Sequence, residues 1–246
     1  MPDPTSPRDE TRIRIVTVAA ELLERGGAAA LTTRAVAQAA GVQAPTIYRL
    51  FGDKDGLLEA VAEHVMGAYV AGKAATVAAA VAAGVDPVEE LRTAWFTQIR
   101  FGIEHPELHA LMSDPERGRR SAAAQAGWQV LRERVVRVAA AGRLRVPVDR
   151  AIDMIGAAGN GAVLATLFRP PAERDPGLPA AMWEAVAAQI LVAAADEGRS
   201  DGGALVAAIS LRAAASELPA LSDGERAVLV EWLDRVAIAL ATPPAS

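Results

Sequence analysis

Two of the three histidines in this chain, His105 and His109, stand four positions apart in the segment HPELH. Two imidazoles at this spacing on one helix can bind zinc, as in the H-E-x-x-H pattern of metalloproteases. Here Pro106 follows the first histidine, and Glu107 stands one place too late for that pattern. Because a helix usually ends before a proline, the two rings need not share a face. We therefore expect no metal site, but a capped helix start with a surface or pocket histidine.

Other catalytic chemistries lack the residues that they need. The chain contains no cysteine, which excludes thiolate nucleophiles and disulfides and favours a reducing cytoplasm. The glycine-rich segment GAAGNG at 156–161 is not followed by Lys-Ser or Lys-Thr, so it is not a phosphate-binding loop. No serine or carboxylate belongs to a constellation with an oriented histidine. We predict that the protein is not an enzyme and uses no cofactor.

Cationic side chains that could bind a polyanion gather in one short stretch. The whole chain has a net charge of −5, and residues 1–66 carry seven Lys and Arg against nine Asp and Glu. Between Thr32 and Lys54 the sign reverses, because Arg34, Arg49 and Lys54 face only Asp53. A local basic face on an acidic body suits a polyanionic partner that touches one spot.

Short helices are predicted on both sides of this stretch. A first helix begins at a Ser6 cap with Pro7 in its first turn, and it is expected to stop at the pair Gly26-Gly27. Thr32 caps a second, short helix that Gly41 ends. Only three residues then separate the second helix from a third.

The third helix, APTIYRLF at 44–51, completes a helix-turn-helix unit. Pro45 is tolerated in the first turn, where the N–H has no intrahelical partner, and Ile47 is expected to enter the core. Gly52 ends this helix, and Asp53 caps a fourth that runs through Val65. Two helices joined by a glycine-containing turn present the outer face of the second. The side chains left on that face are Pro45, Thr46, Tyr48 and Arg49.

The remaining chain is punctuated by Pro and Gly into further helices, so the fold class is all-α. Alanine-rich composition favours helices, and no run of alternating β-branched and polar residues suggests a sheet. Ser222 and Glu225 form a capping box for the last helix. The expected helices cover 87–104, a short segment after Pro106, 121–141, 148–168, 178–195 and two segments after Gly202.

From Ile15 to Leu58 the sequence resembles the DNA-binding domain of the tetracycline-repressor (TetR) family, over roughly the first quarter of the chain. The segment DPVEELRTAWFTQIRFGIEHPELHALM shows a weaker similarity to the second domain of some members. The matching residues are Ile15, Ala19, Leu22, Leu23, Gly27, Thr32, Arg34, Val36, Ala37, Ala40, Gly41, Val42, Thr46, Ile47, Tyr48, Phe51, Lys54, Leu57 and Leu58.

This resemblance implies a homodimer whose third helices enter successive major grooves of a pseudo-palindromic operator, about 34 Å apart. Tyr48 and Lys54 would contact phosphates, and Thr33 and Arg34 would clamp the backbone. Gln43 could pair with adenine, while the Thr46 methyl could touch thymine. The full DNA-binding set that follows is Thr32, Thr33, Arg34, Gln43, Ala44, Pro45, Thr46, Tyr48, Arg49 and Lys54.

Two departures from the family pattern bear on affinity. Leu50 stands where the family often has a polar or aromatic residue, so one phosphate contact is expected to be missing. Gln43 replaces the usual small N-cap residue and is a poorer cap. Ala44 and Pro45 offer bases only apolar contact, which points to modest affinity or to recognition through DNA shape.

A ligand site in the second domain is expected among its few large side chains. Ligand sites are apolar with a few convergent polar groups. Each aromatic residue is also a candidate for ordinary core, and for any single one core is the better prediction. The candidate ligand-binding residues are Trp95, Phe96, Gln98, Ile99, His109, Met112, Trp128, Met154 and Asn160.

The family also places its dimer contact late in the second domain. Small residues of GAAGNG would allow close helix approach there, and we expect helices 148–168 and 178–195 to form the contact. The predicted domains are 1–66 for DNA binding, with residues 1–6 as a disordered tail, and 67–246 for ligand binding and dimerisation.

The sequence thus predicts a ligand-responsive dimeric transcriptional regulator, a repressor released by a small, largely apolar effector. Its partners would be operator DNA, the effector and a second copy, with no membrane. The N-terminus lacks a signal peptide, and the most apolar run is too short to span a bilayer, so a cytoplasmic location is expected. The alternative is a helical small-molecule binding module without DNA binding.

Overall fold

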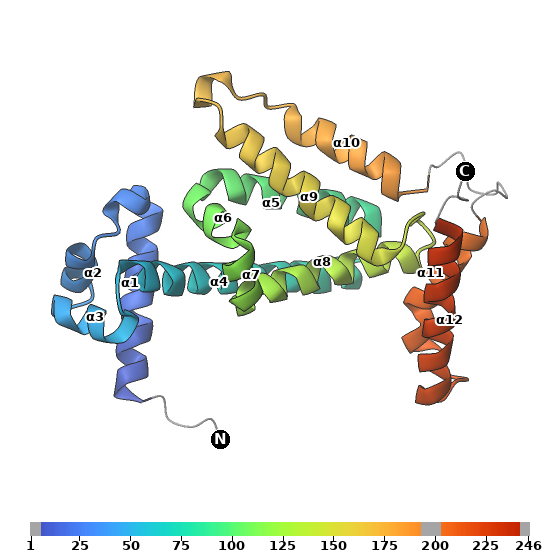
Figure 1. Cartoon of the computed structure of the whole chain (residues 1–246), viewed down its shortest axis with the longest axis horizontal. Coiled ribbons are helices and arrows are strands. Elements are labelled where there is room, and N and C mark those ends of the chain that lie inside the picture. The colour runs from blue at the N-terminus through green and yellow to red at the C-terminus, as the bar shows by residue number, and fades with distance from the viewer. Residues whose placement is uncertain (1–5, 193–202, 242–246) are drawn as a thin grey trace. The chain divides into compact units, whose positions relative to one another are not determined.

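The computed structural model describes residues 6–192 and 203–241, and this part of the chain folds into helices (Figure 1). The predicted all-α class is confirmed. Beside the helices, the described residues contain one isolated antiparallel bridge, between Leu144 and Leu191. The expected tail before Ser6 lies mostly outside the described residues, as do the joint 193–202 and the last five residues.

The chain divides into two compact units. Unit 1 comprises residues 1–74 and 107–127, and unit 2 comprises residues 75–106 and 128–246. Two helices, α4 (Lys54–Ala82) and α8 (Ala122–Ala140), run from one unit into the other. The predicted domain boundary at residue 66 falls inside α4.

Unit 1 contains the N-terminal helices α1 (Pro7–Ala30), α2 (Thr33–Ala39) and α3 (Ala44–Phe51). It also contains the first part of α4, most of α6 (Pro106–Ser113), α7 (Pro115–Arg120) and the start of α8. Helix α2 packs against both α1 and α3. Ile47 is fully buried, as expected. The other buried apolar residues of the three N-terminal helices and early α4 are Ile15, Val16, Ala19, Ala20, Leu23, Val36, Ala37, Leu57, Val61, Ala62 and Met66.

One predicted helix end in unit 1 is wrong. Helix α1 continues through Gly26 and Gly27 to Ala30, because alanines follow the glycines and a glycine in a helix costs only about 1 kcal/mol relative to alanine. Helix α4 continues past Val65 to Ala82, since its later residues are mostly alanine and valine. It ends near Gly84, which has a φ of 65° that favours glycine.

Among the described residues, α4 alone is long and apolar enough to cross a membrane by composition. Much of that apolar character comes from alanine, the residue with the highest helix propensity. Its first turns contribute buried Leu57, Val61 and Ala62 to unit 1, so this part of the helix is already used in packing.

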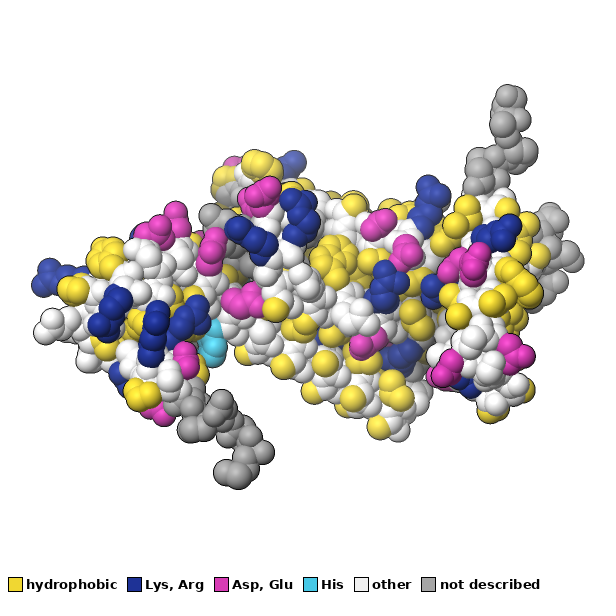
Figure 2. Space-filling model, turned by 60° about the horizontal axis from the view of Figure 1, so that its bottom comes forward, with side chains coloured by type: hydrophobic (Ala, Val, Ile, Leu, Met, Phe, Trp, Pro, Cys, Tyr) yellow, Lys and Arg dark blue, Asp and Glu magenta, His cyan; other side chains and the backbone are white. Residues whose placement is uncertain are grey.

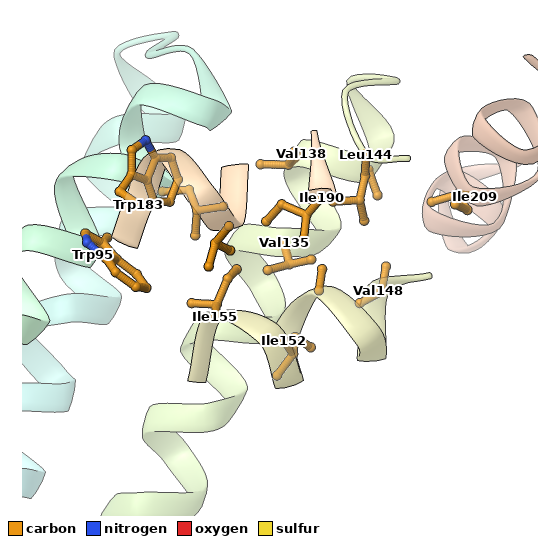
Figure 3. Packing of buried hydrophobic residues seen from close by; sticks show 14 of the residues in the cluster. Trp95, Val135, Val138, Leu144, Val148, Ile152, Ile155, Trp183, Ile190 and Ile209 are labelled. Atoms are coloured by element: carbon orange, nitrogen blue, oxygen red, sulfur yellow. The ribbon is translucent and has the colours of Figure 1, made fainter. Parts of the chain in front are cut away.

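The core of unit 2 is built on α5 (Pro87–Glu104), whose bounds match the prediction. Helix α9 (Val148–Leu167) packs against α5 and against α10 (Leu178–Ile190), and α10 also contacts α5. Figure 3 shows Trp95 and Trp183 beside Ile155 in this core. The two indole rings lie 5.8 Å apart, and Trp95 Nε1 donates a hydrogen bond of 3.0 Å to the Pro179 carbonyl.

A charged pair is buried in the same unit. Glu90 of α5 and Arg134 of α8 are 5% and 4% exposed, and Arg134 Nε donates to Glu90 Oε1 at 2.8 Å. Arg137 Nη1 lies 3.7 Å from the other carboxylate oxygen. Burial of an ion is costly unless a partner neutralises it. The buried charge of Glu90 therefore requires Arg134, and that of Arg134 requires Glu90.

Unit 2 ends in a helical hairpin, α11 (Gly203–Ala214) and α12 (Asp223–Ala241), with a short 3₁₀ turn (Ala215–Glu217) after α11. Arg212 donates two hydrogen bonds to Asp234 across the hairpin, which raises the pKa of Arg212. The capping box is confirmed: Ser222 N donates to Glu225 Oε2 and Glu225 N donates to Ser222 Oγ. The Ser222 hydroxyl also donates to Glu225 Oε2 at 2.7 Å, and this bond, together with the one from Ser222 N, lowers the pKa of Glu225.

The aromatic fluorophores divide between the units. All four tryptophans (Trp95, Trp128, Trp183 and Trp232) belong to unit 2, and both tyrosines (Tyr48 and Tyr69) belong to unit 1.

Candidate functional site

Backbone geometry fixes the turn between α2 and α3. Thr32 caps α2, since its Oγ1 accepts a hydrogen bond of 3.1 Å from Ala35 N. Gly41 takes a φ of 64°, a conformation that favours glycine, and Val42 N then donates back to the Ala37 carbonyl at 2.9 Å. Gln43 is extended and begins α3 without a side-chain capping bond. The predicted helix-turn-helix unit is therefore present.

The outer face of α3 carries the side chains that the sequence placed there. Tyr48 is 51% exposed, whereas its neighbour Ile47 is fully buried. Gln43, Pro45 and Arg49 are exposed. Ala44 and Thr46 are half-buried, so they offer less surface to a partner than the sequence suggested. Around α3, Thr32, Arg34 and Lys54 are exposed and Thr33 is half-buried.

Six exposed cations of helices α1 to α4 have no acidic partner within the described residues. No described carboxylate lies within 4 Å of their charged groups. In contrast, Arg25 at the far end of α1 pairs with Glu21 at 3.0 Å. Figure 2 shows Lys and Arg side chains gathered over the N-terminal helices. The six cations are Arg8, Arg12, Arg14, Arg34, Arg49 and Lys54.

Helix α4 starts where α3 ends. Gly52 has a φ of 82°, and its N–H donates to the Tyr48 carbonyl at 2.8 Å. Asp53 Oδ1 then accepts a bond of 2.7 Å from Gly56 N, which confirms the predicted cap. Asp53 is used in this cap, and no ion pair of the exposed Lys54 beside it is present within the described residues, so Lys54 can bind an anion.

The candidate ligand-binding residues fall into both units. Trp95 and Ile99 lie in the buried core of unit 2, and Phe96, Gln98 and Met154 are half-buried there. Asn160 is exposed on α9. In unit 1, His109 is buried, its Nε2 lies 3.4 Å from Ser113 Oγ, and burial lowers its pKa. The side chain of Met112 lies outside the described residues. Which of these residues contact an effector stays a prediction.

Trp128 has a distinctive environment in unit 2. Its side chain is 49% exposed, and its ring lies directly on Gly156 of α9. A Cβ at Gly156 would lie 2.4 Å from Trp128 Cη2, so only glycine allows this contact. The first glycine of GAAGNG therefore accommodates an aromatic side chain.

Sequence reasoning missed three interactions between distant helices. The guanidinium of Arg12 on α1 lies over the Phe51 ring at the end of α3. Glu63 of α4 accepts hydrogen bonds from Ser121 and Ala123 at the start of α8. Glu90 pairs with Arg134, 44 positions away. None of the three has a local signal in the sequence, because each joins residues far apart along the chain.

Known proteins resemble the N-terminal domain and, over about three quarters of the chain, the fold. Residues 15–61 match the family model described as bacterial regulatory proteins, tetR family. Among solved structures, RolR in complex with resorcinol has a TM-score of 0.56 at 20% identity, over 77% of this chain and 91% of that one. Comparison with curated proteins gives no match.

Two regulators named FadR have the same fold. FadR of Bacillus halodurans, a fatty acid degradation regulator, has a TM-score of 0.53 at 18% identity and covers 76% of this chain and 95% of its own. FadR of Bacillus subtilis, in complex with stearoyl-CoA, has a TM-score of 0.51 at 17% identity and covers 72% and 95%. The N-terminal domain of this chain is thus that of TetR-family transcription regulators, and the chain has the TetR fold.

Proposed function

We propose that the protein is a ligand-responsive, dimeric transcriptional repressor of the cytoplasm. The observation that supports this most is the outer face of α3, where exposed Gln43, Tyr48 and Arg49 stand near Arg34 and Lys54, two exposed cations with no ion pair to any described residue. Phosphates would bind Arg34, Lys54 and the Tyr48 hydroxyl, while Gln43 and Arg49 would reach base edges. Thr32 and Thr33 would position the start of α2 on the backbone, and Ala44, Pro45 and Thr46 would make apolar contacts.

The proposed dimer uses the outer faces of α9 and α10. Because both helices lie on α5, the sides that point away from α5 are free to meet a second copy. Exposed residues repeat at helical spacing on both of these sides, and most are small, which permits close helix packing. They are Ala157, Asn160, Gly161, Leu164, Ala165 and Phe168 on α9, and Ala181, Glu184, Ala185, Ala188 and Gln189 on α10.

An effector would act by a shift in population. A small, largely apolar ligand that binds one dimer geometry better than the other lowers DNA affinity by the difference in its binding free energy. RolR is described with resorcinol and one FadR with stearoyl-CoA, and such ligands support an apolar effector here. Half-buried Phe96 and Met154 and half-exposed Trp128 are the described unit 2 candidates best placed to respond.

Selection of bound duplexes from a random pool tests the DNA-binding proposal. We expect a two-fold symmetric motif that is lost in the double variant Tyr48→Ala and Arg49→Ala. The variant Glu21→Ala and Arg25→Ala, which removes an exposed ion pair of α1 away from α3, is the matched control and should retain the motif. If the purified protein enriches no duplex at low salt, the helical binding module without DNA becomes the better proposal.

A further inference from the structure

Arg12 of α1 contacts the end of α3, the second helix of the helix-turn-helix unit, which is called the reading helix below. Its guanidinium carbon lies 5.2 Å from the centroid of the Phe51 ring, and Phe51 is the last residue of α3. The arginine is exposed and the phenylalanine is half-buried. A cation held over an aromatic face keeps its charge and its outer N–H donors, because the ring occupies only one face of the planar group.

Two further cations, Arg8 and Lys54, stand near Arg12 and Phe51 at this corner of unit 1, beside the exposed carboxylates of Asp9, Asp53 and Asp55. Within the described chain Arg12 has no carboxylate within ion-pair distance, and Lys54 stands three positions after Phe51 at the start of α4. Arg8, one helical turn before Arg12, lies on the same face of α1. An exposed cation–π contact contributes only about 0.5–1 kcal/mol. The contact with Phe51 therefore leaves the guanidinium of Arg12 able to bind an anion as well.

Docking of a helix-turn-helix unit brings this corner close to a DNA strand. The first residues of the reading helix contact base edges, and the surrounding elements contact the sugar-phosphate backbone. Gln43 begins α3 and Phe51 ends it, so a side chain stacked on Phe51 belongs to the backbone-contacting part. The contact with Phe51 holds the guanidinium near the end of α3 before binding, and a planar fork matches two phosphate oxygens.

We propose that Arg12, oriented by Phe51, binds an operator phosphate next to the one that Lys54 would contact. This inference rests on the proposed DNA-binding function and adds α1 to the interface. The contact would be independent of sequence. It would position α3 in the groove without reading bases.

Salt dependence separates this role from a structural one. Each neutralised phosphate contributes a slope of about 0.9 to the fall of log K with log salt. Because both copies of the dimer carry the change, Arg12→Met, which keeps an aliphatic chain against Phe51, should remove two phosphate contacts. We expect the slope to fall by about 1.8 and the affinity at 0.1 M salt by about 60-fold. The loss should be equal for the enriched duplex and for a scrambled duplex. Arg12→Lys should retain the slope.

Arg25→Met is the matched control on the same helix, because Arg25 is exposed and already paired with Glu21. It should leave the slope unchanged. Thermal unfolding of all variants shows whether a loss of DNA affinity is caused by a loss of folded protein. An unchanged slope in Arg12→Met, or an equal change in Arg25→Met, would overturn the proposal while wild-type binding upholds the regulator function. If the wild-type chain binds neither duplex, the regulator function and the Arg12 proposal both fail.

Discussion

At the scale of single residues, the buried pair of Glu90 and Arg134 places the strongest demand on the fold of unit 2. Two charges removed from water are balanced only by each other and by Arg137 nearby. Loss of one partner leaves the other charged in an apolar setting, whereas loss of both leaves packing alone to decide stability. Each charge of the pair is therefore needed to neutralise the other, but the pair as a whole need not make the folded state more stable.

We predict that Glu90→Leu destabilises the protein by about 3–5 kcal/mol, because Arg134 remains buried without its acceptor. The double variant Glu90→Leu and Arg134→Met should recover most of that loss, since both charges are gone and Arg137 is partly exposed to water. Urea unfolding of the two single variants and the double variant measures the coupling. If the double variant loses as much free energy of unfolding as the two single variants together, the unpaired charge is not the cause of the destabilisation.

At the scale of helices, a side chain of α4 caps the start of α8. Glu63 Oε1 accepts a hydrogen bond of 2.7 Å from Ala123 N, and Glu63 Oε2 accepts one of 2.5 Å from Ser121 Oγ. A carboxylate at a helix N-terminus satisfies free amides and favours the helix dipole. Since α4 follows the reading helix and α8 runs on into unit 2, this cap joins the two helices that the units share.

Glu63→Ala should cost about 1 kcal/mol of stability and speed amide exchange in the first turn of α8. The reason is that Ala123 N loses its acceptor while the rest of α8 is unchanged. Glu133→Ala, at an exposed position inside α8, is the control and should stay within about 0.5 kcal/mol of wild type. Exchange that rises equally along α8, or a first turn that stays protected, would contradict the proposed cap.

Local chemistry explains which elements could be predicted. Thr32, Gly41 and Pro45 each act within a few residues of themselves, so α2 and α3 follow from the sequence, as α5 does from Pro87 and Pro106. The pair Gly26-Gly27 misled because the alanines after it continue α1. Contacts such as Arg12 with Phe51 or Glu63 with Ser121 depend on how helices pack, and no sequence period encodes that. Residue type alone could not separate the buried Trp95 from the half-exposed Trp128 either.

At the scale of the whole molecule, assembly is the property that remains to be measured. Gly161 on α9 and Gly67 on α4 are both exposed, and a Cβ at either would meet no described atom of the same chain within 4 Å. Within one copy, a larger side chain at either position therefore meets no steric obstacle. Only a second copy packed on α9 would make the substitution at Gly161 more costly than the one at Gly67.

We predict that Gly161→Leu weakens dimerisation by roughly tenfold or more, because overpacking of a close helix contact costs about 1–3 kcal/mol. Gly67→Leu should leave the monomer–dimer equilibrium unchanged. Sedimentation equilibrium over a range of concentrations measures both. Equal dissociation constants for the two variants would place the dimer contact away from α9.

The division of fluorophores between the units has a practical consequence for spectroscopy. Excitation at the red edge of protein absorption reaches only indoles, so it reports on unit 2 alone, and Trp128 on Gly156 is the indole most open to a quencher after Trp232. Phenol emission arises only from unit 1, where Tyr48 stands on the outer face of α3. A single unlabelled sample could therefore be titrated with operator and with effector in separate optical channels, and the order of the two events could be resolved in time.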